Sequence, residues 1–432
     1  MKNLRRLTLF STLLSAILTF AQETPIDDKY KRSSLSTLMI SDATRELSST
    51  IENVFINAPL IDKFNDHITN IRLVPKTDPA FVYEAPVEEA PKKGFLGKLT
   101  EDLNINSNKE DKEFQHLAIL NYLNSKNIAK SMVAKWFNRS ELGGFNMDLI
   151  AERGFYNASD LDVKIANNTE RGSAMLADAG EALIKNTFVI VNDFNYTNKE
   201  EVATKAKGIL GNITSAAAEY GNSDVATISE STSAAVEVFG KGYIIKTNAY
   251  LYKLVWNEEV AAIFYNDFWN EDASLDMERK KAFDETDLFK LEYVGTETSW
   301  ADLQSTSLTQ KTNEELISVA TIRAVDNVIA KLQKEFEVFR TKTPLISGDP
   351  IAAKIGLKEN LEKGDKYEVL EQVLNDKGIV EYERLGVIKV EKDLIWDNRY
   401  NANEENPSFI EYTTFSGPKN KYYAGMLIRQ IN

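Results

Sequence analysis

Phe188-Val189-Ile190-Val191 decides the fold class, because an uninterrupted apolar run of this kind is typical of a strand that is covered on both faces. Ahead of it, Ser159 followed by Asp162 predicts the start of a long helix, and Asn186 is its predicted end. A strand that follows a helix directly and needs cover on both sides indicates an α/β domain.

Beyond this strand the pattern becomes β-like. Residues 243–256 alternate in the manner of a strand, residues 257–259 predict a turn, and residues 260–269 predict a second strand. The two strands are expected to form an antiparallel hairpin. Residues 289–294 predict a third strand of the same region.

A long helix closes this predicted domain. Thr312 and Glu315 have the spacing of a capping box, in which each side chain bonds to the backbone amide of the other residue. Apolar residues then recur every three or four positions as far as Phe339. Nearer the N-terminus, residues from His116 onward predict a helical region, and residues 150–156 predict a loop.

Past Pro344 the chain is expected to be all β. Asn375-Asp376-Lys377-Gly378 is a tight hairpin signal, and about five short strands predict a small SH3-like barrel. We therefore predict an α+β protein, with a central α/β domain of mixed sheet and long helices followed by a small all-β barrel. The predicted order is signal peptide 1–21, N-terminal α/β segment 22–83, flexible charged linker 84–115, central α/β domain 116–343 and C-terminal barrel-like domain 344–432.

The N-terminus has the pattern of a secretory signal. Basic residues within positions 2–6 precede an apolar run at 7–20, and Thr19-Phe20-Ala21 offers small residues at the cleavage site. Cleavage before Gln22 takes the formal net charge from −14 to −17. The alternatives are a buried N-terminal helix and an uncleaved anchor. No later segment resembles a transmembrane helix.

The composition indicates an exported location and disfavours binding to nucleic acid and anionic membranes. The absence of cysteine is unusual for a eukaryotic secreted protein of 432 residues and fits a bacterial protein in the periplasm, at the outer membrane or outside the cell. The acidic surface disfavours nucleic acid and anionic membranes. The composition leaves the oligomeric state open.

Residue counts also narrow the chemistry. Without cysteine there is no thiolate nucleophile and no cysteine-ligated metal, and the two histidines, His67 and His116, belong to no metal-binding pattern. No nucleotide-binding or serine-nucleophile motif is present. We therefore predict no cofactor, no metal and no assigned catalytic residue. A carboxylate pair remains open as a catalytic device, although 65 acidic residues nominate no particular pair.

Four residues are candidates for binding. Arg153 and Arg171 flank and interrupt the predicted long helix, and either guanidinium has the geometry to hold a carboxylate. Trp396 and Arg399 lie in the segment Trp396-Asp397-Asn398-Arg399-Tyr400, whose aromatic side chains suit a sugar or a peptide. For the arginines the alternative is an intramolecular salt bridge, and for the aromatic segment it is packing at the barrel edge.

The order of elements from Thr187 to Phe339, followed by an all-β module, resembles exported bacterial envelope proteins. These proteins pair an α/β domain like that of curli-secretion subunits with an SH3-like barrel. The segments 153–158 and 425–429 (Arg-Gly-Phe-Tyr-Asn-Ala and Gly-Met-Leu-Ile-Arg) are also similar to those of uncharacterised secreted proteins of Bacteroidetes-type bacteria. The resemblance implies an architecture and an exported location, and it assigns no site residue.

We therefore expect a non-catalytic exported protein of the cell envelope or extracellular space that binds another protein or an envelope polymer, in an assembly or scaffold role. A hydrolase with a paired-carboxylate site is the alternative, and a small-ligand-binding module is the third hypothesis. The C-terminal Met-Leu-Ile-Arg strand is also a candidate sorting signal.

Overall fold

The computed structural model describes residues 33–59, 61–82, 109–157, 182–198, 242–271, 276–304, 312–374, 380–391, 395–405 and 410–431. The predicted signal peptide and Arg171 lie outside these residues. So do most of the predicted linker and the predicted helix that starts at Ser159.

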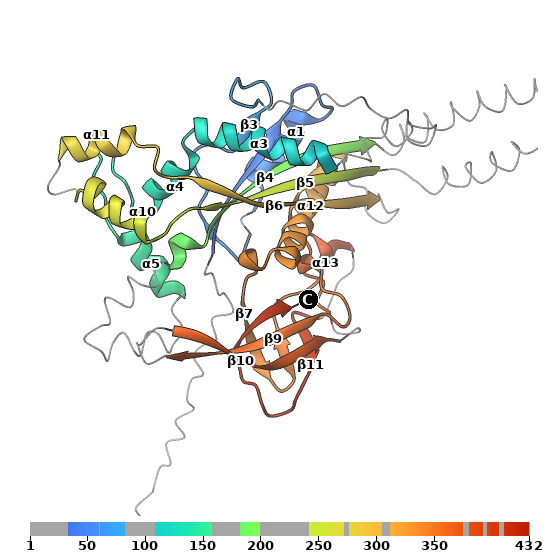
Figure 1. The fold of residues 1–432 in the computed structure, drawn as a ribbon. Helices are drawn as coiled ribbons and strands as arrows, with labels where there is room; N and C mark the ends of the chain where they lie inside the picture. Colours follow the sequence, from blue (N-terminus) through green and yellow to red (C-terminus); the bar gives the residue numbers. More distant parts are fainter. Residues whose placement is uncertain are drawn as a thin grey trace, which may run out of the picture.

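One mixed sheet forms the centre of the molecule, with strand order β2-β1-β4-β5-β6 and β3 also paired to β1 (Figure 1). Its strands are β1 (Ser34–Ser41), β2 (Asn65–Asp66), β3 (Leu73–Pro75), β4 (Thr187–Asn198), β5 (Gly242–Leu254) and β6 (Leu291–Gln304). β1 runs parallel to β2, β3 and β4, whereas β4, β5 and β6 are antiparallel. The sheet therefore joins strands from the predicted N-terminal segment and the predicted central domain.

The apolar run in β4 is covered on both faces, as its composition predicts. Val189 and Val191 belong to one core cluster, and Phe188 and Ile190 belong to another. Because successive side chains of a strand point to opposite faces, these two clusters lie on opposite sides of the sheet.

Helices from two stretches of the chain cover the first face. They are α3 (Lys109–Ser125), α4 (Ile128–Trp136), α5 (Asp148–Asn157), α10 (Glu258–Ile263) with the π-helical turn Phe264–Phe268, and α11 (Met277–Glu285). Aromatic rings dominate this cluster: Phe137 stacks on Phe264 with ring centroids 4.3 Å apart, and Phe145 meets Phe283 edge-on at 5.1 Å.

Two local expectations are wrong on this face. The turn expected at residues 257–259 and the strand expected at residues 260–269 are absent, because residues 258–268 are helical. The Asn257 side chain caps this helix by accepting a hydrogen bond from the Val260 backbone amide at 2.9 Å. The antiparallel neighbours of β5 are instead β4 and β6. Residues 150–156, which were expected to form a loop, lie in helix α5. The helix forms although Gly154 has a low helix propensity, because Ile150 is buried in the aromatic cluster and holds the helix against the core.

The second face is covered by α1 (Ser48–Asn57) and the long helix α12 (Asn313–Glu335). The predicted capping box is confirmed: the Thr312 amide donates to Glu315 Oε2 at 2.8 Å, and the Glu315 amide donates to Thr312 Oγ1 at 3.3 Å. The buried residues of α12 follow the predicted spacing, and a short 3₁₀ turn, Glu337–Phe339, ends the region.

The C-terminal strands form a closed barrel in the order β10-β11-β8-β7-β12-β9. They are β7 (Thr343–Gly348), β8 (Ile351–Ala353), β9 (Lys366–Leu374), β10 (Val380–Val390), β11 (Thr413–Ser416) and β12 (Leu427–Ile431). A 3₁₀ turn, η3 (Leu357–Glu359), and the short helix α13 (Ala402–Glu405) lie in its connections. The protein is therefore of the α+β class, as expected.

The barrel lies on the α12 side of the sheet, and α12 runs between the two (Figure 1). η3 is the part of the barrel region that contacts α12 most closely, and Asn360 Nδ2 donates to the Asn327 carbonyl at 3.3 Å. This junction contains the candidate site.

Candidate functional site

Arg153, the first predicted binding residue, lies inside the α/β body with 8% of its surface exposed. Its Nη1 donates to Ser34 Oγ at 3.2 Å and to His67 Nδ1 at 2.9 Å, and its guanidinium carbon lies 4.6 Å from the Trp136 ring centroid. Burial lowers the pKa of Arg153 from 12.5 to about 10. These contacts connect α5 with β1, α4 and the segment after β2.

His67 has the complementary role in this buried group. Its Nε2 lies 2.9 Å from the Met132 carbonyl, which only accepts, so Nε2 carries the proton and Nδ1 accepts from Arg153. Burial, and then the positive charge of Arg153, lower the pKa of His67 to about 3. A neutral histidine thus orients Arg153 within the fold.

Arg399 forms a bidentate ion pair with Asp397, with Nε–Oδ1 at 2.8 Å and Nη2–Oδ2 at 2.6 Å. The hydrogen bonds from Arg399 lower the pKa of Asp397. This contact is a local charge pair within the segment that follows β10, and the residue does not line the cavity described next.

Of the predicted binding residues that the structure describes, Trp396 lines the cavity described below. Its backbone amide donates to Thr413 Oγ1 at 3.0 Å, and its carbonyl accepts from the Leu357 amide at 2.9 Å, so it is fixed against β11 and η3. The same carbonyl approaches Gly356 so closely that a Cβ there would lie 2.0 Å away, which requires a glycine at this position.

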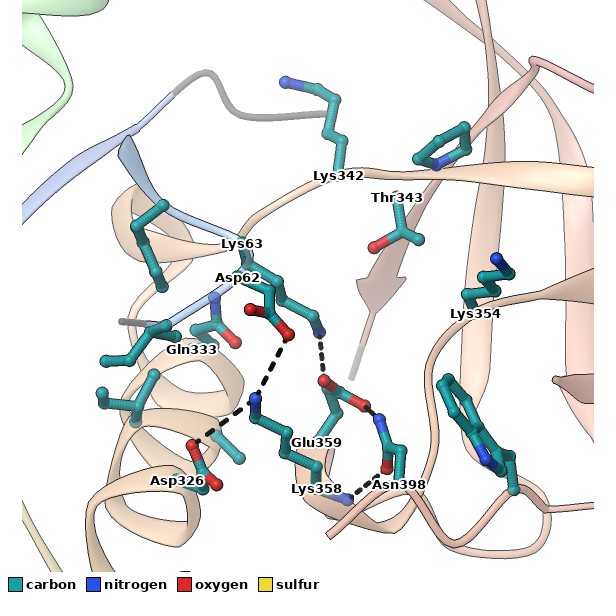
Figure 2. A pocket seen from close by; sticks show the side chains of 16 residues that line it. Asp62, Lys63, Asp326, Gln333, Lys342, Thr343, Lys354, Lys358, Glu359 and Asn398 are labelled. Carbon is teal, nitrogen blue, oxygen red and sulfur yellow. Dashed lines mark hydrogen bonds and ion pairs between the residues drawn. The ribbon is translucent and has the colours of Figure 1, made fainter. Parts of the chain in front are cut away.

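The cavity has a volume of about 370 Å³ and lies between the α/β body and the barrel (Figure 2). From the body come Asp62 and Lys63, which precede β2, and Asp326 and Gln333 on α12. From the barrel side come Lys342, Thr343, Lys354, Lys358, Glu359, Trp396 and Asn398, and apolar residues complete the lining. The lining therefore combines four lysines and three acids with an indole.

Glu359 is the most extensively bonded carboxylate of the cavity. Lys63 Nζ lies 3.2 Å from its Oε1, while Oε2 accepts from the Gly356 amide at 2.6 Å and from Asn398 Nδ2 at 2.9 Å. Burial acts to raise the pKa of Glu359, but Lys63 and the hydrogen bonds together hold it below its ordinary value. Glu359 is thus an ionised anchor between the two parts of the protein.

Lys358 forms the second contact across the junction. Its Nζ lies 3.6 Å from Asp62 Oδ2 and 4.0 Å from Asp326 Oδ1, and Figure 2 shows it reaching from η3 toward α12. Burial acts to lower the pKa of Lys358, but the surrounding acids raise it above its ordinary value. Burial raises the pKa of Asp326 from 3.8 to about 6. The junction therefore holds a charged lysine, Lys358, next to a carboxyl group with a raised pKa of about 6.

Sequence reasoning selected Trp396 but missed the charged residues around it. Lys63, Asp326 and Glu359 come from three distant stretches of the chain, and none belongs to a recognisable motif. The Gly356 amide donates to Glu359 Oε2 at 2.6 Å, but glycine has no side chain with which to complete a capping box, so this turn has no capping signature in the sequence.

Within the described ranges, no cluster of three or more acidic or histidine side chains has the arrangement of a metal site. Over the same ranges, none of the helices combines the length and the apolar character that crossing a bilayer requires. No protein-family model matches this sequence, and no curated protein matches it either.

Proposed function

We propose that the protein is a non-catalytic exported protein of the cell envelope or extracellular space, and that it binds another protein or an envelope polymer through the cavity at the junction. The observation that carries this proposal is the bonding of the Glu359 carboxylate in the cavity, whose side chain is 11% exposed. Glu359 receives a lysine, a backbone amide and a side-chain amide within 3.2 Å.

A carboxylate in this state is a poor catalyst. General acid or base work requires a carboxyl group within hydrogen-bond reach of the proton it transfers, and nucleophilic work requires an accessible oxygen. In Glu359 both oxygens already accept from protein donors. The ion pairs support a role in holding and shaping a binding cavity.

The leader-like N-terminus and the absence of cysteine support export, with the periplasm, the outer-membrane surface or the extracellular space as the location. The closed barrel after the α/β body supports the finer inference of an SH3-like module, and with it the resemblance to exported bacterial envelope proteins. Among the described strands β6 ends the order of the sheet, and a sheet edge supports pairing with a strand of a protein partner.

The second candidate is a hydrolase with a carboxylate pair, which one observation favours. Asp62 Oδ2 and Asp326 Oδ1 lie 3.6 and 4.0 Å from the same Lys358 nitrogen, so they are at most 7.6 Å apart. Glycosidase carboxylates are separated by about 5–10 Å. However, a charged lysine contacts both acids, and the Asp62 side chain is 81% exposed. This arrangement fits a salt bridge across the junction better than an acid and base pair.

The test is affinity capture from the native envelope fraction with the purified protein immobilised. We expect specific recovery of an envelope protein or polymer, and we expect the Lys354→Met variant to recover less of it. Lys389→Met, which removes the same charge from an exposed residue of β10 away from the cavity, is the matched control. Recovery of nothing specific, or hydrolysis of envelope polymer that Asp326→Asn abolishes, would contradict the proposal.

A further inference from the structure

The barrel has a cavity of its own, away from the junction. Its volume is about 540 Å³, which lies within the range of small-molecule sites, about 300–1,000 Å³. β7 begins at Thr343, which lines the junction cavity, and ends at Gly348, which lines this barrel cavity. The two cavities therefore lie at opposite ends of β7. They share no lining residue, so a substitution can change one without touching the other.

Three connections of the barrel form the wall of this cavity. Asp349 and Pro350 make the turn between β7 and β8, Glu391 follows β10, and residues on both sides of β11 complete the lining. The Glu391 amide donates to the Thr414 carbonyl at 3.4 Å, which holds the end of β10 against β11. The cavity is thus part of the barrel framework.

An aromatic ring is exposed in this wall. Tyr412 is 39% exposed, beside exposed Pro350 and half-buried Ile410. Over the described ranges, the Tyr412 side chain takes part in no ring stacking and no hydrogen bond. A ring that lines a hollow and lacks such contacts offers its flat face to the apolar face of a ligand, while its hydroxyl remains polar.

Charged side chains of both signs surround the ring. Asp349, Glu391 and Lys419 line the cavity and are exposed, and none of them forms a side-chain hydrogen bond or ion pair in the part of the chain that the structure describes. Carboxylates accept hydrogen bonds and an ammonium group donates them. An ion of either sign meets repulsion from one of these groups. A neutral ligand with several hydroxyl groups matches all of them.

Thr414 adds a buried hydroxyl without a partner. Its neighbour Phe415 packs in the barrel core, so the Thr414 side chain points outward, because successive side chains of a strand alternate. Thr414 is only 9% exposed, and its Oγ1 has no hydrogen-bond partner among the described residues. A buried hydroxyl in this state is unfavourable. A ligand hydroxyl at this wall, bonded directly or through a bound water, supplies the missing partner.

We propose that the barrel cavity binds one ring of a neutral sugar, with the ring packed on Tyr412 and its hydroxyl groups bonded to Asp349 and Glu391. The two oxygens of a carboxylate accept from neighbouring hydroxyl groups, which a sugar ring presents in adjacent pairs. This inference goes beyond the proposed function, because it assigns a ligand to a second site that the junction cavity does not include.

The test is saturation-transfer NMR of the purified full-length protein with glucose, galactose and N-acetylglucosamine, and with glucuronate and galacturonate as charged counterparts. We expect at least one neutral sugar to bind with a dissociation constant of about 1 mM, which suits a ligand of this size. Each uronate should bind no more tightly than its neutral counterpart. Binding of none of the neutral sugars, or tighter binding of the uronates, would overturn the inference.

Substitutions then locate the binding. Tyr412→Ala should weaken binding of the neutral sugar about tenfold or more, and Glu391→Gln should weaken it about fivefold. Tyr423→Ala is the matched control, because Tyr423 is a 55% exposed barrel tyrosine that does not line the cavity. An unchanged affinity in both Tyr412→Ala and Glu391→Gln, or an equal loss in Tyr423→Ala, would contradict the site.

An oligosaccharide of the bound sugar distinguishes the two sources of the ring. Tighter binding of the oligosaccharide indicates a unit of a polymer, tighter binding of the monosaccharide indicates a free sugar, and either result supports the inference. Lys354→Met, in the junction cavity, should leave sugar binding unchanged. Loss of envelope capture with sugar binding intact contradicts the proposed function alone, whereas absence of sugar binding with capture intact overturns this inference alone.

Discussion

The two sides of α12 have different neighbours, although they belong to one continuous helix. Toward the sheet, the helix presents buried apolar residues at four-residue spacing, Leu316, Ala320, Ala324, Val328 and Leu332. Toward the barrel, it presents Asp326, Ile329, Ala330 and Gln333 to the junction cavity. Positions 324 and 326 differ by two residues, or about 200° around a helix, which places them on opposite sides.

The difference separates the main source of stability from the proposed place of binding. The sheet side is dry and closely packed, and each apolar side chain there contributes to folding. The barrel side is hollow, and its charges are compensated by ion pairs across the junction, which contribute less to folding because the charges had to be removed from water. The charged groups of the junction therefore contribute less to folding than the apolar side chains on the sheet side do, as expected if the junction has the proposed binding role.

The largest expected effect is on the dry side. Leu332 is fully buried against the sheet, so Leu332→Ala should lower the free energy of unfolding by about 2–5 kcal/mol through lost apolar burial and the cavity left behind. Urea denaturation measures this change. Glu335→Ala, at an exposed position on the same helix, is the control and should differ from the wild type by less than about 0.5 kcal/mol. Equal losses in the two variants would contradict the division of α12.

A smaller, pH-dependent effect is expected on the cavity side. The pKa of Asp326 in the folded protein is about 6, above its ordinary value of 3.8. As the pH rises between these values, the unfolded chain loses this proton first, so ionisation of Asp326 progressively destabilises the fold. Asp326→Asn removes that cost and should gain up to about 3 kcal/mol of stability over the wild type by about pH 7, and little at about pH 4.

The groups that face Asp326 across the junction are Lys358 and Glu359 of η3 and Asp62 and Lys63 of the segment before β2. Urea denaturation of the wild type and Asp326→Asn over this pH range measures the difference, with Glu335→Gln as the control on the exposed side of α12. A difference between Asp326→Asn and the wild type that does not change with pH would show that the carboxyl group is not held in the environment described here.

Much of the fold follows from local sequence patterns. The apolar run 188–191 and the capping box at Thr312 and Glu315 each depend on neighbouring residues only, and the structure confirms both. Residues 260–269 were misassigned because a run of bulky apolar side chains fits either a strand or a buried helix, and the aromatic cluster that buries Phe264 and Phe268 is formed by distant parts of the chain.

The candidate site was less accessible from sequence. Asp326 and Gln333 have the spacing of an ordinary solvent-facing helix stripe, and they are covered because the barrel region and the segment before β2 both lie against this side of α12. Lys63 and Glu359 are nearly three hundred positions apart, so their ion pair depends on how the two parts of the protein meet. Trp396 was selected because an aromatic residue in a polar loop is a local feature.

Hydrogen–deuterium exchange in the presence and absence of the envelope component recovered by affinity capture tests the central claim, that the junction cavity is the binding site, most directly. The account predicts that exchange slows in the segments that contain Lys63, Lys354 to Glu359 and Trp396, and that the Lys354→Met variant loses this protection. Slower exchange that is confined to other parts of the protein, or that is equal in the variant, would contradict the claim.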